Sequence, residues 1–185
     1  VHNFPSKRVS VNGLSFRYLD HGEGDLVIFL HGFPYFADVW YKQMGELGKS
    51  YRTVAVDNRG YAYSDKPKNV EDYRVANMVE DVRGLIQKLS PSGRAVVVGH
   101  DWGGGVAGGL AQKYPDIVSK LVVINSPPGN VFLSVLEKSQ AQRDVSQYVD
   151  RLKSPLAPYY LWFKGPEVFW GASMETMLAL SLIHI

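Results

Sequence analysis

Short apolar runs alternate with stretches of helical periodicity along most of the chain. The runs lie at residues 26–30, 53–56, 95–98 and 118–124. Runs without polar alternation are typical of strands buried on both faces of a sheet. Residues 75–89 place apolar side chains every three or four positions, which predicts an amphipathic helix. The alternation therefore predicts an α/β fold, with a mostly parallel sheet and helices on both faces.

Further elements are expected around this core. Alternating residues on either side of Asn12-Gly13 predict a hairpin, because this dipeptide accepts positive φ at both central positions of a type I′ turn. Residues 102–113 are expected to form a helix although they contain five glycines. The pattern then changes to longer, more polar helical stretches, so we expect a core unit over residues 1–127 and a second unit over residues 128–185.

Composition excludes several classes of function. With 45% hydrophobic and 21% charged residues, the chain can bury one ordinary core. A formal charge of +2 provides no broad basic field, so nucleic acid is not an expected partner. No apolar run approaches the roughly 18 residues of a membrane helix, so we expect a soluble segment, with the cytoplasm as the default compartment. Without cysteine, disulfides and thiolate metal sites are excluded, and nothing indicates an oligomeric state.

The segment Gly99-His100-Asp101-Trp102-Gly103 joins a predicted strand to a predicted helix. It fits a nucleophile elbow, a tight turn that needs small residues two positions before and after the nucleophile. Asp101 takes the central position. A carboxylate is ionised at neutral pH and can attack an electrophilic sp³ carbon directly, which gives an alkyl ester of the enzyme. An epoxide or a carbon–halogen bond is a suitable substrate group. The alternative is that Asp101 only caps the helix.

Backbone N–H groups are expected to stabilise the negative charge that develops when water attacks this ester. The start of the helix offers the N–H of Trp102, and the loop His31-Gly32-Phe33-Pro34 offers the N–H of Phe33. This loop begins at the carboxyl end of a central strand, where ligands bind in open α/β sheets. The alternative is that its other residues only shape the loop.

Three motifs in this order resemble those of the soluble epoxide hydrolases and their haloalkane dehalogenase relatives, which have the α/β-hydrolase fold. The motifs are the His31 loop, the segment Asp57-Asn58-Arg59-Gly60-Tyr61 with Ser64-Asp65-Lys66-Pro67, and the elbow, and the similarity covers residues 11–125. The resemblance implies that residues 1–127 are the N-terminal part of the hydrolase core and residues 128–185 part of a helical cap. It also implies a substrate pocket lined by His31, Pro34 and Trp102, a small-molecule substrate, and no metal or organic cofactor.

The resemblance also assigns a role to the cap. In epoxide hydrolases, two cap tyrosines donate hydrogen bonds to the epoxide oxygen during the attack. The segment Tyr159-Tyr160-Leu161-Trp162-Phe163 is similar to the segment that carries the first of them. Tyr159 fits that register best, with Tyr160 as the alternative, and a neutral phenol is suited to protonate a developing alkoxide. The competing interpretation is an aromatic stripe that packs the cap on the core.

The sequence leaves the choice between an epoxide and a haloalkane open. In dehalogenases the tryptophan after the nucleophile donates its indole N–H to the halide, whereas in epoxide hydrolases it supplies a backbone N–H and a pocket wall. Trp102 fits both roles. A second halide donor, often asparagine, would follow His31, where this chain has Gly32, and this favours an epoxide. A non-catalytic ligand-binding member, or an inert fragment, is the alternative from another class.

Other polar residues near the motifs are expected to be structural. His100 is adjacent to Asp101, but neighbours around a tight elbow point in different directions. Asp57 and Arg59 follow a strand and could contact substrate, but the resemblance implies that they maintain the loop architecture through a buried ion pair. Ala62 stands where the family usually has glycine, which is expected to change the local backbone without changing the chemistry.

The second half of the reaction needs a histidine that activates water and an acid that orients this histidine. Only His184 follows the nucleophile, within the expected cap, so we expect both residues to lie beyond Ile185. Six strands are expected where the family has eight, which makes the strand at 118–124 an exposed edge. Residues 174–185 fit no cap pattern, and whether they belong to the natural chain stays open.

Overall fold

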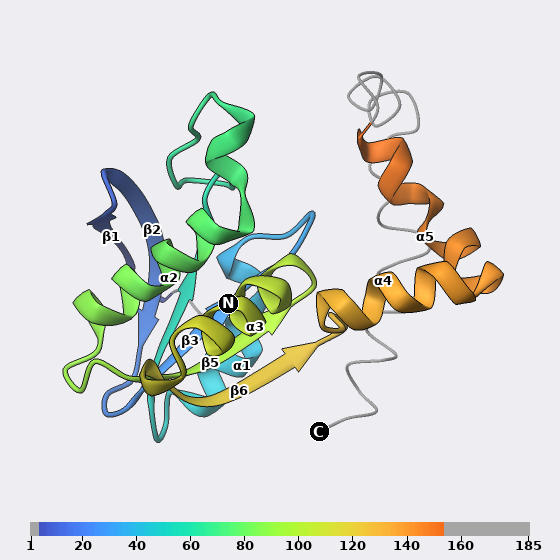
Figure 1. Cartoon of the computed structure of the whole chain (residues 1–185). Coiled ribbons are helices and arrows are strands. Elements are labelled where there is room, and N and C mark those ends of the chain that lie inside the picture. Colours follow the sequence, from blue (N-terminus) through green and yellow to red (C-terminus); the bar gives the residue numbers. More distant parts are fainter. Residues whose placement is uncertain (1–3, 154–185) are drawn as a thin grey trace. The chain divides into compact units, whose positions relative to one another are not determined.

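The structure, a computed structural model, describes residues 4–153 (Figure 1). Its strands are β1 (Ser6–Val11), β2 (Leu14–His21), β3 (Leu26–Leu30), β4 (Arg52–Val56), β5 (Ala95–His100) and β6 (Val118–Ile124). Its helices are η1 (Ala37–Trp40), α1 (Tyr41–Leu47), η2 (Val70–Tyr73), α2 (Val75–Leu89), α3 (Trp102–Lys113), η3 (Pro115–Ile117), α4 (Gly129–Lys138) and α5 (Gln140–Lys153). The expected α/β architecture is confirmed.

The opening hairpin forms where the sequence predicts it. Strands β1 and β2 pair in antiparallel register, from Ser6 opposite Leu19 to Val11 opposite Leu14. The turn residues Asn12 and Gly13 have φ values of 51° and 78°. Positive φ at both positions matches the right-handed twist of the two strands, so the turn sets their register.

The six strands form one sheet in the order β1-β2-β4-β3-β5-β6. Strands β3, β4, β5 and β6 run parallel to one another, and β2 pairs antiparallel with β4. From β3 the chain moves first to β4 on one side and later to β5 on the other. This reversal is a topological switch point, so the loops after β3 and β5 diverge there and leave room for a ligand.

Helices cover both faces of the sheet. Along β3, Ile28 and Leu30 belong to one core cluster, which includes residues of α2 and α3. Val27 and Phe29 belong to a second cluster, which includes residues of η1 and α1. Since successive side chains of a strand point to opposite faces, α2 and α3 lie on one face of the sheet and α1 on the other (Figure 1).

Strand β6 lies at the edge of the sheet and is less buried than the strands before it. Leu121, Val122 and Val123 are each 41–43% exposed, whereas β3 is buried over its whole length. The expectation of an exposed edge at residues 118–124 is therefore confirmed for the part of the chain that the structure describes. A free strand edge offers unpaired backbone groups to another strand.

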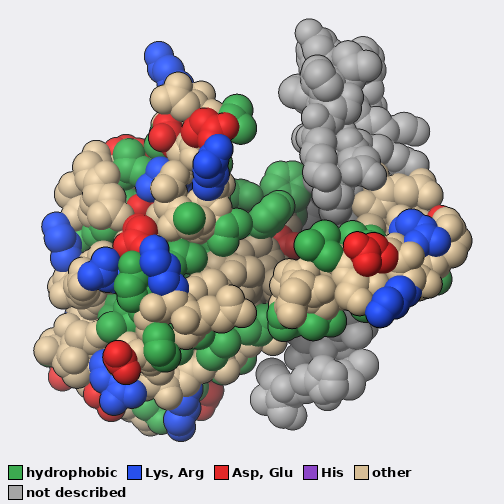
Figure 2. Space-filling model, in the orientation of Figure 1, with side chains coloured by type: hydrophobic (Ala, Val, Ile, Leu, Met, Phe, Trp, Pro, Cys, Tyr) green, Lys and Arg blue, Asp and Glu red, His purple; other side chains and the backbone are tan. Residues whose placement is uncertain are grey.

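The chain divides into two compact units, Val1–Gly129 and Asn130–Ile185. The division falls two residues after the expected boundary, and the assignment of the second unit to a cap stays a prediction. Within residues 4–153, no helix is long and apolar enough to cross a membrane. On the face shown in Figure 2, acidic and basic side chains of the first unit are interspersed, without one extended basic patch.

The glycines of α3 differ in their surroundings. A Cβ on Gly103 would lie 2.2 Å from the carbonyl oxygen of Leu30, which is backbone at the end of β3. A Cβ on Gly105 would meet nothing within 4 Å. The glycine at position 103 therefore lets the helix approach the sheet, while the glycine at position 105 only lowers helix propensity.

We predict opposite effects for alanine at these two positions. Gly103→Ala should destabilise the protein by about 2 kcal/mol or more, because backbone must move to relieve the overlap. Gly105→Ala should stabilise it by up to about 1 kcal/mol through helix propensity. Urea unfolding of the complete gene product measures both changes. Equal midpoints for the two variants would contradict the close approach of α3 to β3.

Glu80 links α2 to α3. Its Oε1 accepts hydrogen bonds from Lys113 Nζ at 2.7 Å and from the Tyr114 hydroxyl at 2.6 Å. Its Oε2 accepts a bond from Arg83 at 3.2 Å. The hydrogen bonds from Lys113 and Tyr114 lower the pKa of Glu80 from its ordinary 4.5 to about 2. The lowered pKa means that the folded state favours the charged form.

This shift predicts a pH-dependent contribution to stability. The contribution is complete above pH 4.5 and disappears as the pH falls towards 2, because the unfolded chain takes up the proton first. Glu80→Gln should therefore lower the free energy of unfolding by about 1 kcal/mol at pH 7 and by progressively less in acid. The matched control is Glu46→Gln, which breaks one exposed pair with Lys49. A Glu80→Gln effect that is constant with pH would count against the linkage.

Candidate active site

Asp101 lies in a tight turn between β5 and α3. Its backbone has φ 52° and ψ −121°, a conformation that residues with a side chain rarely adopt. A Cβ on Gly99 would lie 2.3 Å from the Gly103 carbonyl oxygen, so the turn has room only for glycine there. Strained backbone of this kind concentrates at functional sites. The geometry is that of the elbow predicted from the glycine spacing.

The carboxylate of Asp101 does not cap α3. The helix has no side-chain hydrogen bond at its N-cap position, so the interpretation of Asp101 as a capping residue is wrong. Oδ1 instead accepts a hydrogen bond from the N–H of Phe33 at 2.9 Å. This bond connects the two residues across 68 positions of sequence. It brings together the predicted nucleophile and one of the two predicted oxyanion donors.

The loop after β3 approaches Asp101 closely at Gly32. A Cβ on Gly32 would lie 2.4 Å from both Cβ and Oδ1 of Asp101. Pro34, which follows Phe33 through a cis peptide bond, is partly exposed. Its predicted place in the substrate pocket stays a prediction.

Trp102 is the first residue of α3 and its side chain is exposed, at 56% of the residue surface. Its backbone N–H belongs to the first turn of the helix, where N–H groups have no partner within the helix. This position agrees with the predicted donor role. Both roles of Trp102, oxyanion donor and pocket wall, stay predictions.

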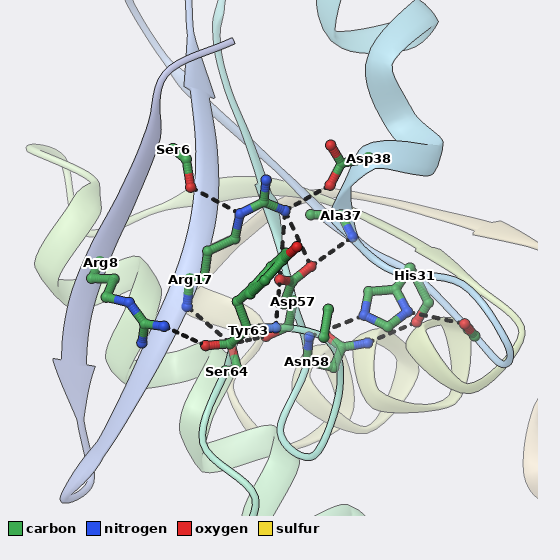
Figure 3. A network of polar contacts seen from close by, with 12 residues as sticks. Ser6, Arg8, Arg17, His31, Ala37, Asp38, Asp57, Asn58, Tyr63 and Ser64 are labelled. Carbon is green, nitrogen blue, oxygen red and sulfur yellow. Dashed lines mark hydrogen bonds and ion pairs between the residues drawn. The ribbon is translucent and has the colours of Figure 1, made fainter. Parts of the chain in front are cut away.

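His31 differs from its expected place in the substrate pocket, because the structure buries it completely. Its Nε2 accepts a hydrogen bond from the N–H of Asn58 at 3.0 Å, and its Nδ1 lies 2.9 Å from the carbonyl oxygen of Gly32 (Figure 3). The edge of one ring meets the face of the other between His31 and Tyr61, with 4.8 Å between centroids. Because the ring is fully buried and both of its nitrogens contact backbone atoms, we assign His31 to support of the loop and not to the substrate pocket.

Tyr61 lies next to His31 in the structure, although the sequence indicated it only as part of a motif. Its ring is partly buried against His31. Burial, together with the negative charge of Asp101, raises the pKa of Tyr61 to about 12. The phenol is therefore neutral over the whole physiological range. Burial also lowers the pKa of His100, so this histidine is more readily neutral beside the elbow.

Asp57 and Arg59 form two separate buried networks, where the sequence suggested one ion pair. Asp57 is fully buried and accepts hydrogen bonds from the N–H groups of Ala37 at 2.8 Å and Tyr63 at 3.2 Å (Figure 3). The Arg17 guanidinium lies 3.5 Å from this carboxylate. Both networks fix the loop after β4, as expected, but their partners come from other elements.

The Arg59 network is the tighter of the two. Nε and Nη2 of Arg59 donate to the two carboxylate oxygens of Asp81 at 2.7 and 2.8 Å. In the same loop, Ala62 has φ 38°, a left-handed conformation that glycine adopts more readily than alanine.

Several predicted residues cannot be placed. Tyr159, its alternative Tyr160, and His184 lie outside the described residues. Within residues 4–153, no group of three or more histidine, aspartate or glutamate side chains is arranged to hold a metal ion. The described part of the site offers the carboxylate of Asp101 and the backbone N–H of Phe33.

Comparison with known proteins agrees with this geometry. The chain is 38% identical over 156 residues to Epoxide hydrolase 3 of Xenopus tropicalis, covering 83% of this chain and 42% of that protein. It is 35% identical over 182 residues to Epoxide hydrolase 1 of Caenorhabditis elegans, covering 97% of this chain and 43% of that protein. The chain therefore spans less than half the length of these two relatives.

Solved structures give the same result. A mutant epoxide hydrolase from Bacillus megaterium, complexed with its product, superimposes with a TM-score of 0.80 at 36% identity, over 84% of this chain and 54% of that chain. The family model described as "alpha/beta hydrolase fold" matches residues 25–159. With the strained elbow at Asp101 and this sheet order, that match shows that the chain belongs to the α/β-hydrolase fold family.

Proposed function

We propose that this chain carries the nucleophile of an enzyme that hydrolyses epoxides to vicinal diols through a covalent ester on Asp101. The observation that supports the proposal most strongly is the 2.9 Å hydrogen bond from Phe33 N–H to Asp101 Oδ1 at the strained elbow. The names of the relatives from Xenopus tropicalis and Caenorhabditis elegans support epoxides as the substrate class.

The two carboxylate oxygens have different roles in this mechanism. Oδ1 is held by the Phe33 amide, and among the described residues no hydrogen bond reaches Oδ2. Oδ2 is therefore the oxygen that attacks an epoxide carbon. The new carbon–oxygen bond forms as the ring carbon–oxygen bond breaks, and the electron pair goes to the epoxide oxygen. A neutral phenol, for which Tyr159 is the candidate, supplies the proton that this oxygen takes up.

The ester is then hydrolysed. Water adds to the carbonyl carbon of the ester, and negative charge develops on its carbonyl oxygen, which is Oδ1. The Phe33 N–H is already hydrogen-bonded to this atom, and the Trp102 N–H at the start of α3 is the second donor. The bond between Cγ of Asp101 and Oδ2 then breaks, so Oδ2 takes up a proton and leaves as a hydroxyl of the diol, while the oxygen of the water stays in the restored Asp101 carboxylate. The histidine and acid that activate water are expected outside the described residues.

Haloalkane hydrolysis is the second candidate, because the same nucleophile also displaces halide. The relatives that this chain resembles carry the name epoxide hydrolase, which favours an epoxide as the substrate. Halide release from a bromoalkane without turnover of styrene oxide would reverse this preference.

Substitution of the nucleophile tests the proposal. In the complete gene product, Asp101→Asn should abolish both the covalent adduct with styrene oxide and diol formation, with activity lower by at least about 10⁴-fold. Asp116→Asn, at an exposed position in η3, is the matched control and should keep full activity. Mass spectrometry of the intact protein and of its peptides detects and locates the adduct.

The same experiment separates the alternatives. An adduct that persists in Asp101→Asn would show that another residue is the nucleophile. A wild-type protein that binds styrene oxide but forms neither adduct nor diol would support the non-catalytic, ligand-binding alternative.

A further inference from the structure

Among the described residues, Asn58 makes no hydrogen bond to the nucleophile or to the oxyanion donors, but it makes two hydrogen bonds to one residue of the active-site loop. Its backbone N–H donates to His31 Nε2 at 3.0 Å. Its side-chain Nδ2 donates to the His31 carbonyl oxygen at 2.7 Å. Figure 3 shows both bonds, which join the loop after β4 to the loop after β3.

The partners of His31 determine which ring nitrogen carries the proton. A backbone N–H only donates, so Nε2, which faces the N–H of Asn58, is the acceptor. A carbonyl oxygen only accepts, so Nδ1, which lies 2.9 Å from the Gly32 carbonyl oxygen, is the donor. His31 is fully buried, and burial lowers its pKa, so the ring stays in this neutral tautomer at neutral pH.

The Gly32 carbonyl and the Phe33 N–H belong to one planar peptide unit. Its oxygen accepts hydrogen bonds from His31 Nδ1–H and from the N–H of Tyr35, both at 2.9 Å. In a trans peptide the N–H points opposite to the carbonyl, so these bonds aim the Phe33 N–H at Asp101 Oδ1. Hydrogen bonds to the carbonyl also polarise the peptide and make its N–H a stronger donor.

We propose that Asn58 is a positioning residue for the oxyanion site: through His31, it holds the Gly32–Phe33 peptide so that the Phe33 N–H meets the oxyanion formed during ester hydrolysis. This inference rests on the proposed function. Asn58 itself contacts no reacting atom. Loss of its side chain frees the His31 carbonyl and lets the β3 loop rotate, which weakens the Phe33 donor.

The inference predicts that the two chemical steps respond differently to Asn58→Ala. Ester hydrolysis should slow by about tenfold or more, within the range of about 10²–10³ for the loss of a whole oxyanion donor. Ester formation should change by less than about threefold, because a weaker bond to Oδ1 does not hinder attack by Oδ2. Single-turnover rapid quench with styrene oxide, followed by mass spectrometry of the complete gene product, measures both rates.

The matched control is Asn77→Ala. The Asn77 Nδ2 also donates to a backbone carbonyl, that of Glu71 at 3.0 Å, but at the start of α2. Both rates should stay at the wild-type level in this variant. If Asn58→Ala does not fold, Asn58→Asp replaces it, because aspartate has the same shape but offers an acceptor where the amide offers a donor.

Equal rates for hydrolysis in wild type and Asn58→Ala, or equal slowing of both steps, would overturn the inference. If the wild-type protein forms no ester, the proposed function fails, and a readout without turnover decides the inference. This readout is the NMR resonance of the Phe33 amide proton, which should move upfield in Asn58→Ala and stay in place in Asn77→Ala. An unchanged resonance in Asn58→Ala would also overturn the inference.

Discussion

The hydrogen bond between Phe33 and Asp101 depends on three backbone segments that approach each other without side chains between them. A Cβ on Gly32 would overlap the Asp101 side chain, and a Cβ on Gly99 or Gly103 would overlap a backbone carbonyl oxygen, in each case at 2.2–2.4 Å. Because glycine is the only residue that fits these positions, the ends of β3 and β5 and the start of α3 can meet at one point. The sheet order then places that point at the topological switch of the fold.

Buried charges hold the neighbouring loop after β4. Asp57 is fully buried, and the cost of removing this carboxylate from water is offset by two backbone N–H donors and by the nearby Arg17 guanidinium. Arg59 and Asp81 form a two-point pair on the other side of the loop. Asn58 lies between Asp57 and Arg59 in the sequence, so these interactions also hold its backbone N–H next to His31. In the proposed account, these ion pairs and hydrogen bonds therefore help to position the Phe33 amide indirectly, through Asn58 and His31.

Much of the core could be predicted because its signals are local. Each central strand is a continuous apolar run, and Asn12-Gly13 is adjacent to the two strands that it joins. The elbow was predictable from glycine spacing alone, since the same five residues both make the turn and carry the nucleophile. The exposed edge at β6 followed from the family resemblance, because six strands are expected here where the family has eight.

What could not be predicted depends on contacts between distant residues. The partners of Asp57 and Arg59 lie in β2 and α2, and no pattern near the β4 loop indicates them. The family resemblance implied that His31 lines a pocket, but its ring is hydrogen-bonded to Asn58, 27 positions later. Tyr61 and Asn58 were visible only as members of a motif. Their roles depend on the neighbouring positions of β3 and β4, which local sequence does not encode.

Covalent attack by Asp101 is tested most directly by the origin of the oxygen that enters the diol. The measurement is a single turnover of an epoxide by excess enzyme in water enriched with oxygen-18, with mass spectrometry of the product and of the peptide that contains Asp101. Attack by the carboxylate predicts an unlabelled diol and one oxygen-18 in Asp101, because water adds to the ester carbonyl. A diol that carries oxygen-18 in the first turnover would contradict it, since water would then have attacked the epoxide itself.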